Sequence, residues 1–316
     1  MMEFHTKYAF MSTGAVRRLL DERSAPQNKD LPDAEYMIPV VSMYAVNCPR
    51  TSRQWHPRDP TQIGVQHDFY GLWLEASQIK HSCISNANRS FIGDMQIIRA
   101  SCNMPAGTQL AIWYQTPTDN YGEMLNGFAK WQLVCRCAYC VDLQTAPQAV
   151  IDERHRLIEK LGNMADENPL YPDDIEESVH LIQGTWYIHP WHVPRPTLVP
   201  IFVMLSRKYL DMCIPDRARS MCYRALESLG FAFSVYQGPP YAIVTINRWG
   251  LMTHDALDAF THLCDIHVFS GAPHLAVQAR DHAKLAYKIW IGEDATFDGY
   301  MEQASRYRHG FQALMP

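Results

Sequence analysis

The chain lacks the sequence features of several large protein classes. Its longest apolar run, Leu198–Leu205, contains Pro200 and is far shorter than the roughly 18 residues that a membrane span needs. The N-terminal residues have no basic stretch followed by an apolar one, so we expect no secretory signal. A Gly-rich phosphate loop, a Ser-His-Asp order and an HExxH helix are also missing. The sequence therefore predicts no membrane span and none of these familiar catalytic sites.

A charge excess of one sign is also lacking. The chain has 28 Lys and Arg residues against 33 Asp and Glu residues, interspersed, with a net charge of −5. This balance argues against a nucleic-acid partner. The chain has nine cysteines, an odd number, and no expected secretory signal, which together argue against a disulfide scaffold. We expect a reducing intracellular compartment, the cytoplasm, with the nucleus as the alternative.

The chain has enough apolar residues to bury a sizeable core, since 47% of its 316 residues are hydrophobic. Its length predicts two domains. Residues 1–146 have a mixed pattern of short apolar stretches and turn-rich segments, which is typical of short strands with irregular connections. The stretches that we interpret as strands or buried segments are Met37–Ala45, Phe69–Leu74, Phe91–Ile98 and Gln109–Tyr114.

Residues 147–316 have a helical pattern. Apolar residues at helical spacing follow Pro147 until Gly162. Further helices are predicted over Asp173–Gln183, Leu198–Cys213, Asp216–Leu229, His254–Phe269, His274–Ile291 and Thr296–Gly310. Two long aromatic loops, Gly184–Pro196 and Phe231–Gly250, interrupt them. Antiparallel helix pairs of this size predict a tetratricopeptide-like array, although the sequence has no residue-level repeat signature.

Three cysteines lie within six residues, at Cys135, Cys137 and Cys140. Three thiolates this close repel each other unless a cation shares them, and tetrahedral zinc at about 2.3 Å from each sulfur suits such a tight loop. A fourth ligand must come from elsewhere in the chain. The alternative is three packed cysteines without a metal.

Three short segments resemble motifs of SET-domain proteins. Residues Ser77–Ala87 (SQIKHSCISNA) resemble the NHSCxPNA signature, and Gly107–Tyr114 (GTQLAIWY) resembles the GEELxIxY strand of that family. Residues Trp131–Cys140 look like its post-SET zinc loop. The order, the spacing and the helical C-terminal part resemble the SMYD branch of the family.

This resemblance implies a fold, a metal site and an activity. The fold class would be α+β: an incomplete SET-like β fold with a post-SET zinc site in residues 1–146, followed by an all-α tetratricopeptide-like domain in residues 147–316. The family's fourth zinc ligand corresponds to Cys83, so structural zinc would be held by Cys83, Cys135, Cys137 and Cys140. The family transfers methyl groups from S-adenosylmethionine, with Tyr114 matching the tyrosine at the transfer site and His81 a histidine near the cofactor.

Two departures from the family pattern concern the cofactor. SET methyltransferases have an N-terminal GxG segment whose backbone approaches the cofactor. No such segment precedes the signature here, so the chain is expected to begin inside the family fold, after the first strands. Lys80 stands where the family has an asparagine that contacts S-adenosylmethionine. Since that cofactor carries a sulfonium and an ammonium, a nearby lysine would repel it. We therefore expect S-adenosylmethionine to bind weakly or not at all.

Three functions remain open. The first is a cofactor-free enzyme that cyclises or isomerises an apolar natural-product intermediate in a cleft between the domains, with Tyr114 and Lys80 as donors to a carbonyl oxygen. The second is a non-catalytic module that binds a protein or peptide at the helical domain, and the third is a lysine methyltransferase. In the first case the side chains expected to bind the substrate are His81, Trp73, Trp186, His189, Trp191, His192, Tyr236 and Tyr241. Ordinary packing is the alternative role of the aromatic loops.

Overall fold

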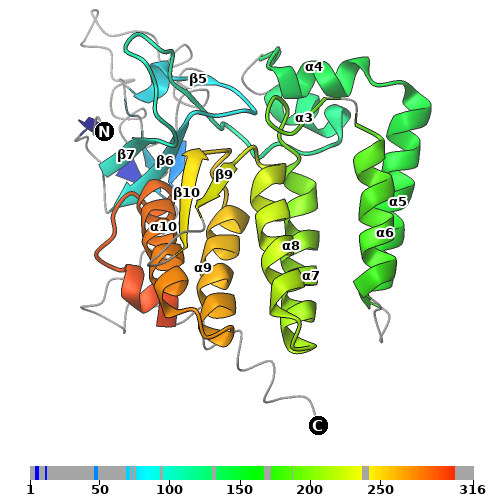
Figure 1. The fold of residues 1–316 in the computed structure, drawn as a ribbon. Coiled ribbons are helices and arrows are strands. Elements are labelled where there is room, and N and C mark those ends of the chain that lie inside the picture. Colours follow the sequence, from blue (N-terminus) through cyan, green and yellow to red (C-terminus); the bar gives the residue numbers. More distant parts are fainter. Residues whose placement is uncertain are drawn as a thin grey trace, which may run out of the picture.

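A computed structural model describes most of the chain beyond residue 75, and four short segments and residue 73 before it. The described residues are 4–6, 11–12, 46–48, 69–71, 73, 76–92, 95–129, 133–166, 172–186, 188–236 and 242–302. Within them helices and small sheets are mixed and the C-terminal part is mainly helical, as predicted (Figure 1). The segment Met37–Ala45 lies outside the described residues. No helix in this described part is long and apolar enough to cross a membrane.

The strands are short, and most lie in the N-terminal part. They are β1 (Phe4–Thr6), β2 (Met11–Ser12), β3 (Val46–Cys48), β4 (Phe69–Gly71), β5 (Lys80–His81), β6 (Ala87–Ile92), β7 (Met95–Ala100), β8 (Ala111–Ile112), β9 (Ala232–Tyr236) and β10 (Ile243–Arg248). The described strands form two three-stranded sheets, β1-β7-β6 and β2-β4-β3, and two two-stranded sheets, β5-β8 and β10-β9.

The helices follow the predicted order, with two additions. They are α3 (Tyr121–Phe128), α4 (Ala138–Thr145), α5 (Gln148–Asp166), α6 (Pro172–Gly184), α7 (Val199–Asp211), α8 (Pro215–Ser228), α9 (His254–Phe269) and α10 (Pro273–Ile291), with short 3-10 turns at Ala76–Gln78 and Pro196–Leu198. The additions are α3 and α4. Residues 297–302 are also helical, within the range predicted for the last helix.

The strands β6 and β7 pair in antiparallel fashion, with Ile92 opposite Met95. The apolar stretch Phe91–Ile98, interpreted above as a strand or buried segment, therefore contributes to two strands. Phe91 and Ile98 are buried in one small core with Trp73, and Gly292 lies against Ile97 and Ser90. Both faces of the hairpin are therefore covered, so apolar residues continue in the sequence on both sides of Gly93 and Asp94.

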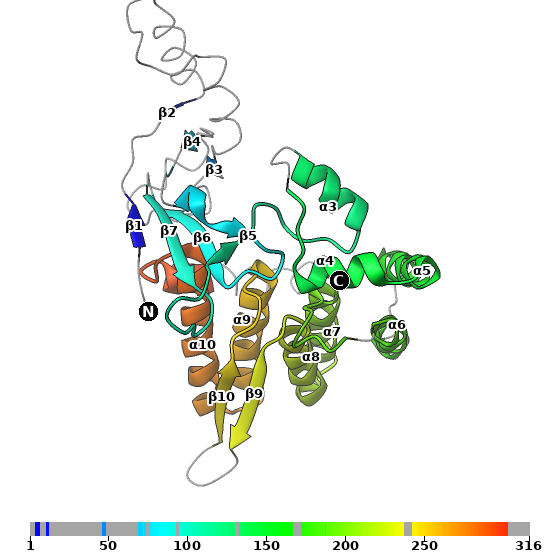
Figure 2. The same ribbon diagram turned by 90° about the horizontal axis from the view of Figure 1, so that it is seen from above.

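Consecutive helices pack in pairs, and the pairs α5–α6, α7–α8 and α9–α10 stand in a row (Figures 1 and 2). Their buried side chains form one large core that includes Phe202, Leu226, Phe260 and Tyr287. The array is not all-α, which corrects the prediction. A hairpin of β9 and β10 occupies the segment expected to be an aromatic loop, Phe231–Gly250.

The β9–β10 hairpin follows from local residue types. β10 is rich in β-branched residues, which suit a pleated, half-buried surface. The cross-strand pair Phe233 and Ile246 packs against the helical core, and the side chain of Gln278 on α10 accepts from the Val244 amide at 2.8 Å. Phe233 and Ile246 therefore hold this strand pair against the helices.

The β6–β7 hairpin closes over the C-terminal end of α10. Asn88 Nδ2 donates to the carbonyl oxygens of Ile289 and Trp290 at 3.1 and 3.0 Å, and buried Arg99 Nε donates to Gly292 O at 2.8 Å. Helix ends leave such carbonyls without internal partners. The N-terminal strands and the helical array are thus packed together at this point, with hydrogen bonds between them.

Candidate zinc centre and the adjoining tyrosine

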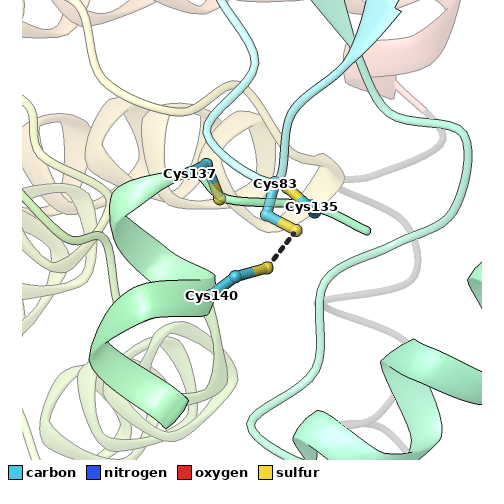
Figure 3. Close-up of side chains that lie close together, drawn as sticks. All are labelled: Cys83, Cys135, Cys137 and Cys140. Carbon is cyan, nitrogen blue, oxygen red and sulfur yellow. Dashed lines mark hydrogen bonds between the residues drawn. The ribbon is translucent and has the colours of Figure 1, made fainter. Parts of the chain in front are cut away.

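Four cysteine thiols from two distant parts of the sequence meet at one place. The ligand atoms of Cys83, Cys135, Cys137 and Cys140 all lie within 4.8 Å of one another (Figure 3). Cys83 Sγ is 3.5 Å from Cys140 Sγ. This is the set that the resemblance implied.

The helix α4 positions two of the four thiols. Cys137 is its N-cap residue and Cys140 lies in its first turn, where the Val141 amide donates to Cys137 O at 3.0 Å. The N-terminal end of a helix carries partial positive charge, which favours thiolates there. Cys83 reaches the cluster from the segment that follows β5 (Figure 3).

The donor set fits zinc. A tetrahedron with sulfur about 2.3 Å from the metal places the sulfurs about 3.8 Å apart, close to the spacing found here. Without a cation the thiols must share protons. Hydrogen bonds from Cys137 and Cys140 hold the pKa of Cys135 well below its usual range, and those with Cys135 and Cys137 raise the pKa of Cys83. Since all four offer sulfur, the site leaves no position for a substrate and suits a structural role.

A buried apolar shell surrounds the thiols. Met124 and Phe128 of α3, Leu143 of α4 and Val193 pack in one cluster with them. Such a shell limits the access of water to the site. Trp113 Nε1 also donates to the carbonyl oxygen of Cys83 at 3.0 Å, which fixes the backbone of that residue.

Tyr114 lies beside this centre and is half-buried. Its hydroxyl donates to Ile79 O at 2.6 Å, and its amide donates to His81 Nδ1 at 3.1 Å. Trp113 packs on the helical core and Tyr114 on the core around Trp73. The two side chains thus point to different sides.

The segments that carry His81 and Tyr114 are bound to each other by backbone pairing. β5 pairs in parallel with β8, with Lys80 opposite Ala111 and His81 opposite Ile112. Asn86 adds two hydrogen bonds to this pairing. Its backbone amide donates to Ala111 O at 3.2 Å, and its side-chain Oδ1 accepts from the Ala111 backbone amide at 2.9 Å. Lys80 itself is exposed at the start of β5.

The aromatic and histidine side chains predicted to bind a substrate occupy different surroundings. His81 lies beside the Cys83 thiol and in ring contact with Tyr114, whereas Trp73 is buried against Phe91 with ring centroids 5.1 Å apart. Trp186 packs on the helical core. The described residues therefore do not gather as one lining.

The remaining predicted side chains lie mainly on the surface. His189 and Trp191 form an edge-to-face pair with centroids 5.0 Å apart, and Trp191 is 53% exposed. His192 and Tyr236 are exposed, and Tyr241 lies outside the described residues. The clearest cavity in the described part of the chain, about 10 Å³, is lined by residues of α8, α9, α10 and the β9–β10 hairpin, such as Phe233, His267 and His282. That volume is about the size of one water molecule.

Sequence reasoning missed a buried polar network behind α4. Arg195 is 1% exposed and pairs with Asp142 of α4 at 3.1 Å, and buried Arg154 of α5 lies with it against Trp186. Burial lowers the pKa of both arginines. The signal was present in the sequence, because Arg154 stands three residues before Leu157, on the apolar face of its helix.

A second buried carboxylate joins the zinc loop to the helical array. The hydroxyl of Tyr139, next to Cys140 on α4, donates to Asp119 Oδ1 at 2.5 Å, and the Thr197 hydroxyl donates to the other Asp119 oxygen. Burial, followed by the nearby Asp119 charge, raises the pKa of Tyr139 well above its usual value. Asp119 thus connects α4, which carries Cys140, to the segment that leads into α7.

Comparison with known proteins gives one informative relative. A protein of Gibberella zeae named "Methyltransferase" is 28% identical to the chain over 285 residues, which cover 84% of this chain and 38% of the relative. The chain therefore spans less than two-fifths of the length of that relative. No protein-family profile matches the chain. The similarity supports a methyltransferase-like fold.

Proposed function

We propose that this chain is a SET-type protein-lysine methyltransferase of the SMYD branch, with structural zinc held by Cys83, Cys135, Cys137 and Cys140. The relative named a methyltransferase supports this class of activity. The four thiols support the zinc site. The pairing of β5 with β8 supports the SET type, because it joins the two segments whose sequences resemble that family.

The main support for methyl transfer to an amine is the hydrogen bond from the Tyr114 hydroxyl to Ile79 O. A tyrosine hydroxyl has one hydrogen to donate and lone pairs that accept. Because the hydrogen is directed at Ile79 O, the hydroxyl oxygen acts toward other groups as an acceptor. A lysine amine is a donor, so Tyr114 can orient an amine nucleophile.

The same hydrogen bond argues against the cofactor-free cyclase. That mechanism requires Tyr114 and Lys80 to donate to one carbonyl oxygen. Lys80 is exposed rather than directed into a cavity, and the cavity described above is lined by other residues. Methyl transfer, the third hypothesis from the sequence, is therefore the function that the geometry supports best.

The proposed activity requires S-adenosylmethionine, whose positive charge Lys80 would oppose. When bound, the cofactor would supply an electrophilic methyl group. Lys80 has the same charge sign as the sulfonium, but it is exposed to water. Two like charges 4 Å apart repel by about 1 kcal/mol in bulk water and by about 4 kcal/mol at an effective dielectric of 20. Because solvent and side-chain mobility weaken the interactions of exposed charges, we take the lower value, so Lys80 would weaken the binding of the cofactor without preventing it.

Radiolabelled S-adenosylmethionine with a mixture of lysine-containing proteins tests the proposal. The zinc-loaded chain should transfer label to lysine, and Tyr114→Phe should lower the rate roughly 10²-fold, as expected when a nucleophile loses its orientation. The control is Tyr236→Phe, which removes a hydroxyl from an exposed tyrosine of the β9–β10 hairpin.

Zinc content and thermal unfolding of both variants show whether the fold is retained. Transfer by Tyr114→Phe at the parent rate would contradict the role of the hydroxyl. An absence of transfer by the folded, zinc-loaded parent, together with no measurable binding of S-adenosylmethionine, would contradict the proposed function.

A further inference from the structure

The imidazole of His81 touches the metal centre on one side and the Tyr114 strand on the other. Its Nδ1 accepts from the Tyr114 amide at 3.1 Å, and its Nε2 lies 3.3 Å from Cys83 Sγ. The ring is flanked by Phe128 and Tyr114, with centroid distances of 4.6 and 5.5 Å. One side chain therefore contacts a candidate zinc ligand and the backbone of the proposed transfer tyrosine.

These contacts determine where the imidazole proton resides. A neutral imidazole has one N–H and one acceptor nitrogen, and the hydrogen bond at one nitrogen determines the role of the other. Because Nδ1 accepts from an amide, the hydrogen must be on Nε2. This N–H then faces Cys83 Sγ, where a zinc-bound thiolate would accept it.

We propose that His81 is a positioning residue that couples the zinc centre to Tyr114. As the Nε2-protonated tautomer it donates to the Cys83 thiolate, which strengthens zinc binding, and its Nδ1 fixes the Tyr114 backbone. The family resemblance placed His81 near the cofactor; the contacts described here assign it a second role. This inference rests on the zinc site and the Tyr114 role under the proposed function.

Nuclear magnetic resonance on the zinc-loaded, ¹⁵N-labelled chain tests the tautomer directly. Long-range correlations between the ring protons and nitrogens distinguish the two neutral forms. We expect His81 to be protonated at Nε2. Protonation at Nδ1 would overturn the proposal, and this measurement needs no variant.

Two substitutions separate the two contacts of the ring. In His81→Gln the side-chain amide can reach the Nε2 position and donate to Cys83, but it offers no acceptor at the Nδ1 position. In His81→Asn the shorter side chain places an acceptor near the Nδ1 position and loses the donor to sulfur. Exposed His155 on α5 provides the matched control, His155→Gln.

The readouts are zinc affinity, measured by competition with a chelator, and hydrogen exchange of the Tyr114 amide. His81→Asn should lose roughly 10–100-fold in zinc affinity, as is typical for a partner of a metal ligand, and keep the amide protected. His81→Gln should hold zinc nearly as tightly as the parent while the amide exchanges faster. The control should match the parent in both.

Equal effects of the two substitutions on both readouts would indicate a merely structural role and overturn the proposal. Neither readout depends on methyl transfer. A chain that transfers no methyl group but has the expected tautomer and zinc affinities would contradict the proposed function alone. A parent chain without stoichiometric zinc would contradict the zinc site and this inference together.

Discussion

At the scale of single residues, Cys83 connects segments that are far apart in the sequence. Its thiol joins the post-SET-like cluster of Cys135, Cys137 and Cys140, and its carbonyl accepts from Trp113. A metal at this point would close a loop of about 50 residues and remove conformational freedom from the unfolded chain. Losing one thiol should therefore affect more of the protein than the local turn.

We expect Cys137→Ser to abolish stoichiometric zinc binding and to lower the free energy of unfolding by several kcal/mol, because structural zinc binding is coupled to folding. Elemental analysis and urea unfolding measure the two effects. The matched control is Cys213→Ser, at an exposed cysteine outside the cluster. A zinc-free parent, or equal stability of parent and Cys137→Ser, would refute the site.

Lys80 provides a second test at this scale. Lys80→Asn restores the residue found in the family and removes a like charge, so we expect S-adenosylmethionine to bind about fivefold more tightly, in line with about 1 kcal/mol of repulsion in water. Isothermal titration calorimetry measures the change. Lys160→Asn, at an exposed lysine on α5, controls for net charge. Unchanged affinity in Lys80→Asn would show that this ammonium does not reach the cofactor.

At the scale of elements, the end of α10 depends on both its own sequence and the β6–β7 hairpin. Gly292 has a φ of 100°, in the left-handed region that ends many helices and favours glycine. A Cβ there would overlap the Ser90 hydroxyl and crowd Ile97. The glycine therefore serves the turn and the close approach of the hairpin at once.

The two effects can be separated with a second left-handed glycine. Gly271 follows α9 with a φ of 65° and has nothing within 4 Å of an added Cβ. We expect Gly271→Ala to cost about 1–2 kcal/mol, the strain of a left-handed alanine. Gly292→Ala should cost about 1–3 kcal/mol more, because the methyl group must also displace its neighbours. Urea unfolding compares them, and equal costs would show that the hairpin yields without penalty.

Helices were the most predictable elements. The range predicted for α9, His254–Phe269, has the bounds found in the structure, because its apolar spacing and the Thr253 cap are local signals. The β9–β10 hairpin was missed, because its aromatic residues sit among prolines and glycines that indicate loops. Helix α3 was missed because its pattern is short and contains two glycines, which are poor helix formers, and only Met124 and Phe128 are buried.

The candidate site was predictable only in part. Local spacing indicated a metal at Cys135, Cys137 and Cys140, but nothing local points to Cys83, which the family resemblance supplied. The contacts of His81 with Cys83 and the Tyr114 amide depend on the pairing of β5 with β8, a long-range feature that residue patterns do not encode. The division at residue 146 falls between α4 and α5 and stays a prediction.

At the scale of the whole molecule, the helical core contains buried groups that link stability to pH. His267 of α9 is 2% exposed. Burial, with the nearby charges of Arg219 and His274, lowers the pKa of His267 to about 4 from its usual 6.5. The unfolded chain therefore binds a proton at this residue at a higher pH than the folded chain does.

Stability should consequently fall as the pH drops from about 6.5 towards about 4. Within this window His267 contributes a slope of at most about 1.4 kcal/mol per pH unit, the value for one proton. Urea unfolding of the parent and of His267→Gln across the window measures the contribution as a difference in slope. The exposed His155→Gln is the control. Parallel slopes for parent and His267→Gln would contradict this assignment.

The hydrogen bonds from Arg99 to Gly292 also constrain how the protein folds during synthesis. The partners are 193 residues apart, and ribosomes add about 5–20 residues per second, so the carbonyl follows the guanidinium by roughly 10–40 s. Until then the cation cannot be buried with its native partner. The packing of the β6–β7 hairpin against the end of α10 can therefore form only after α10 has been synthesised.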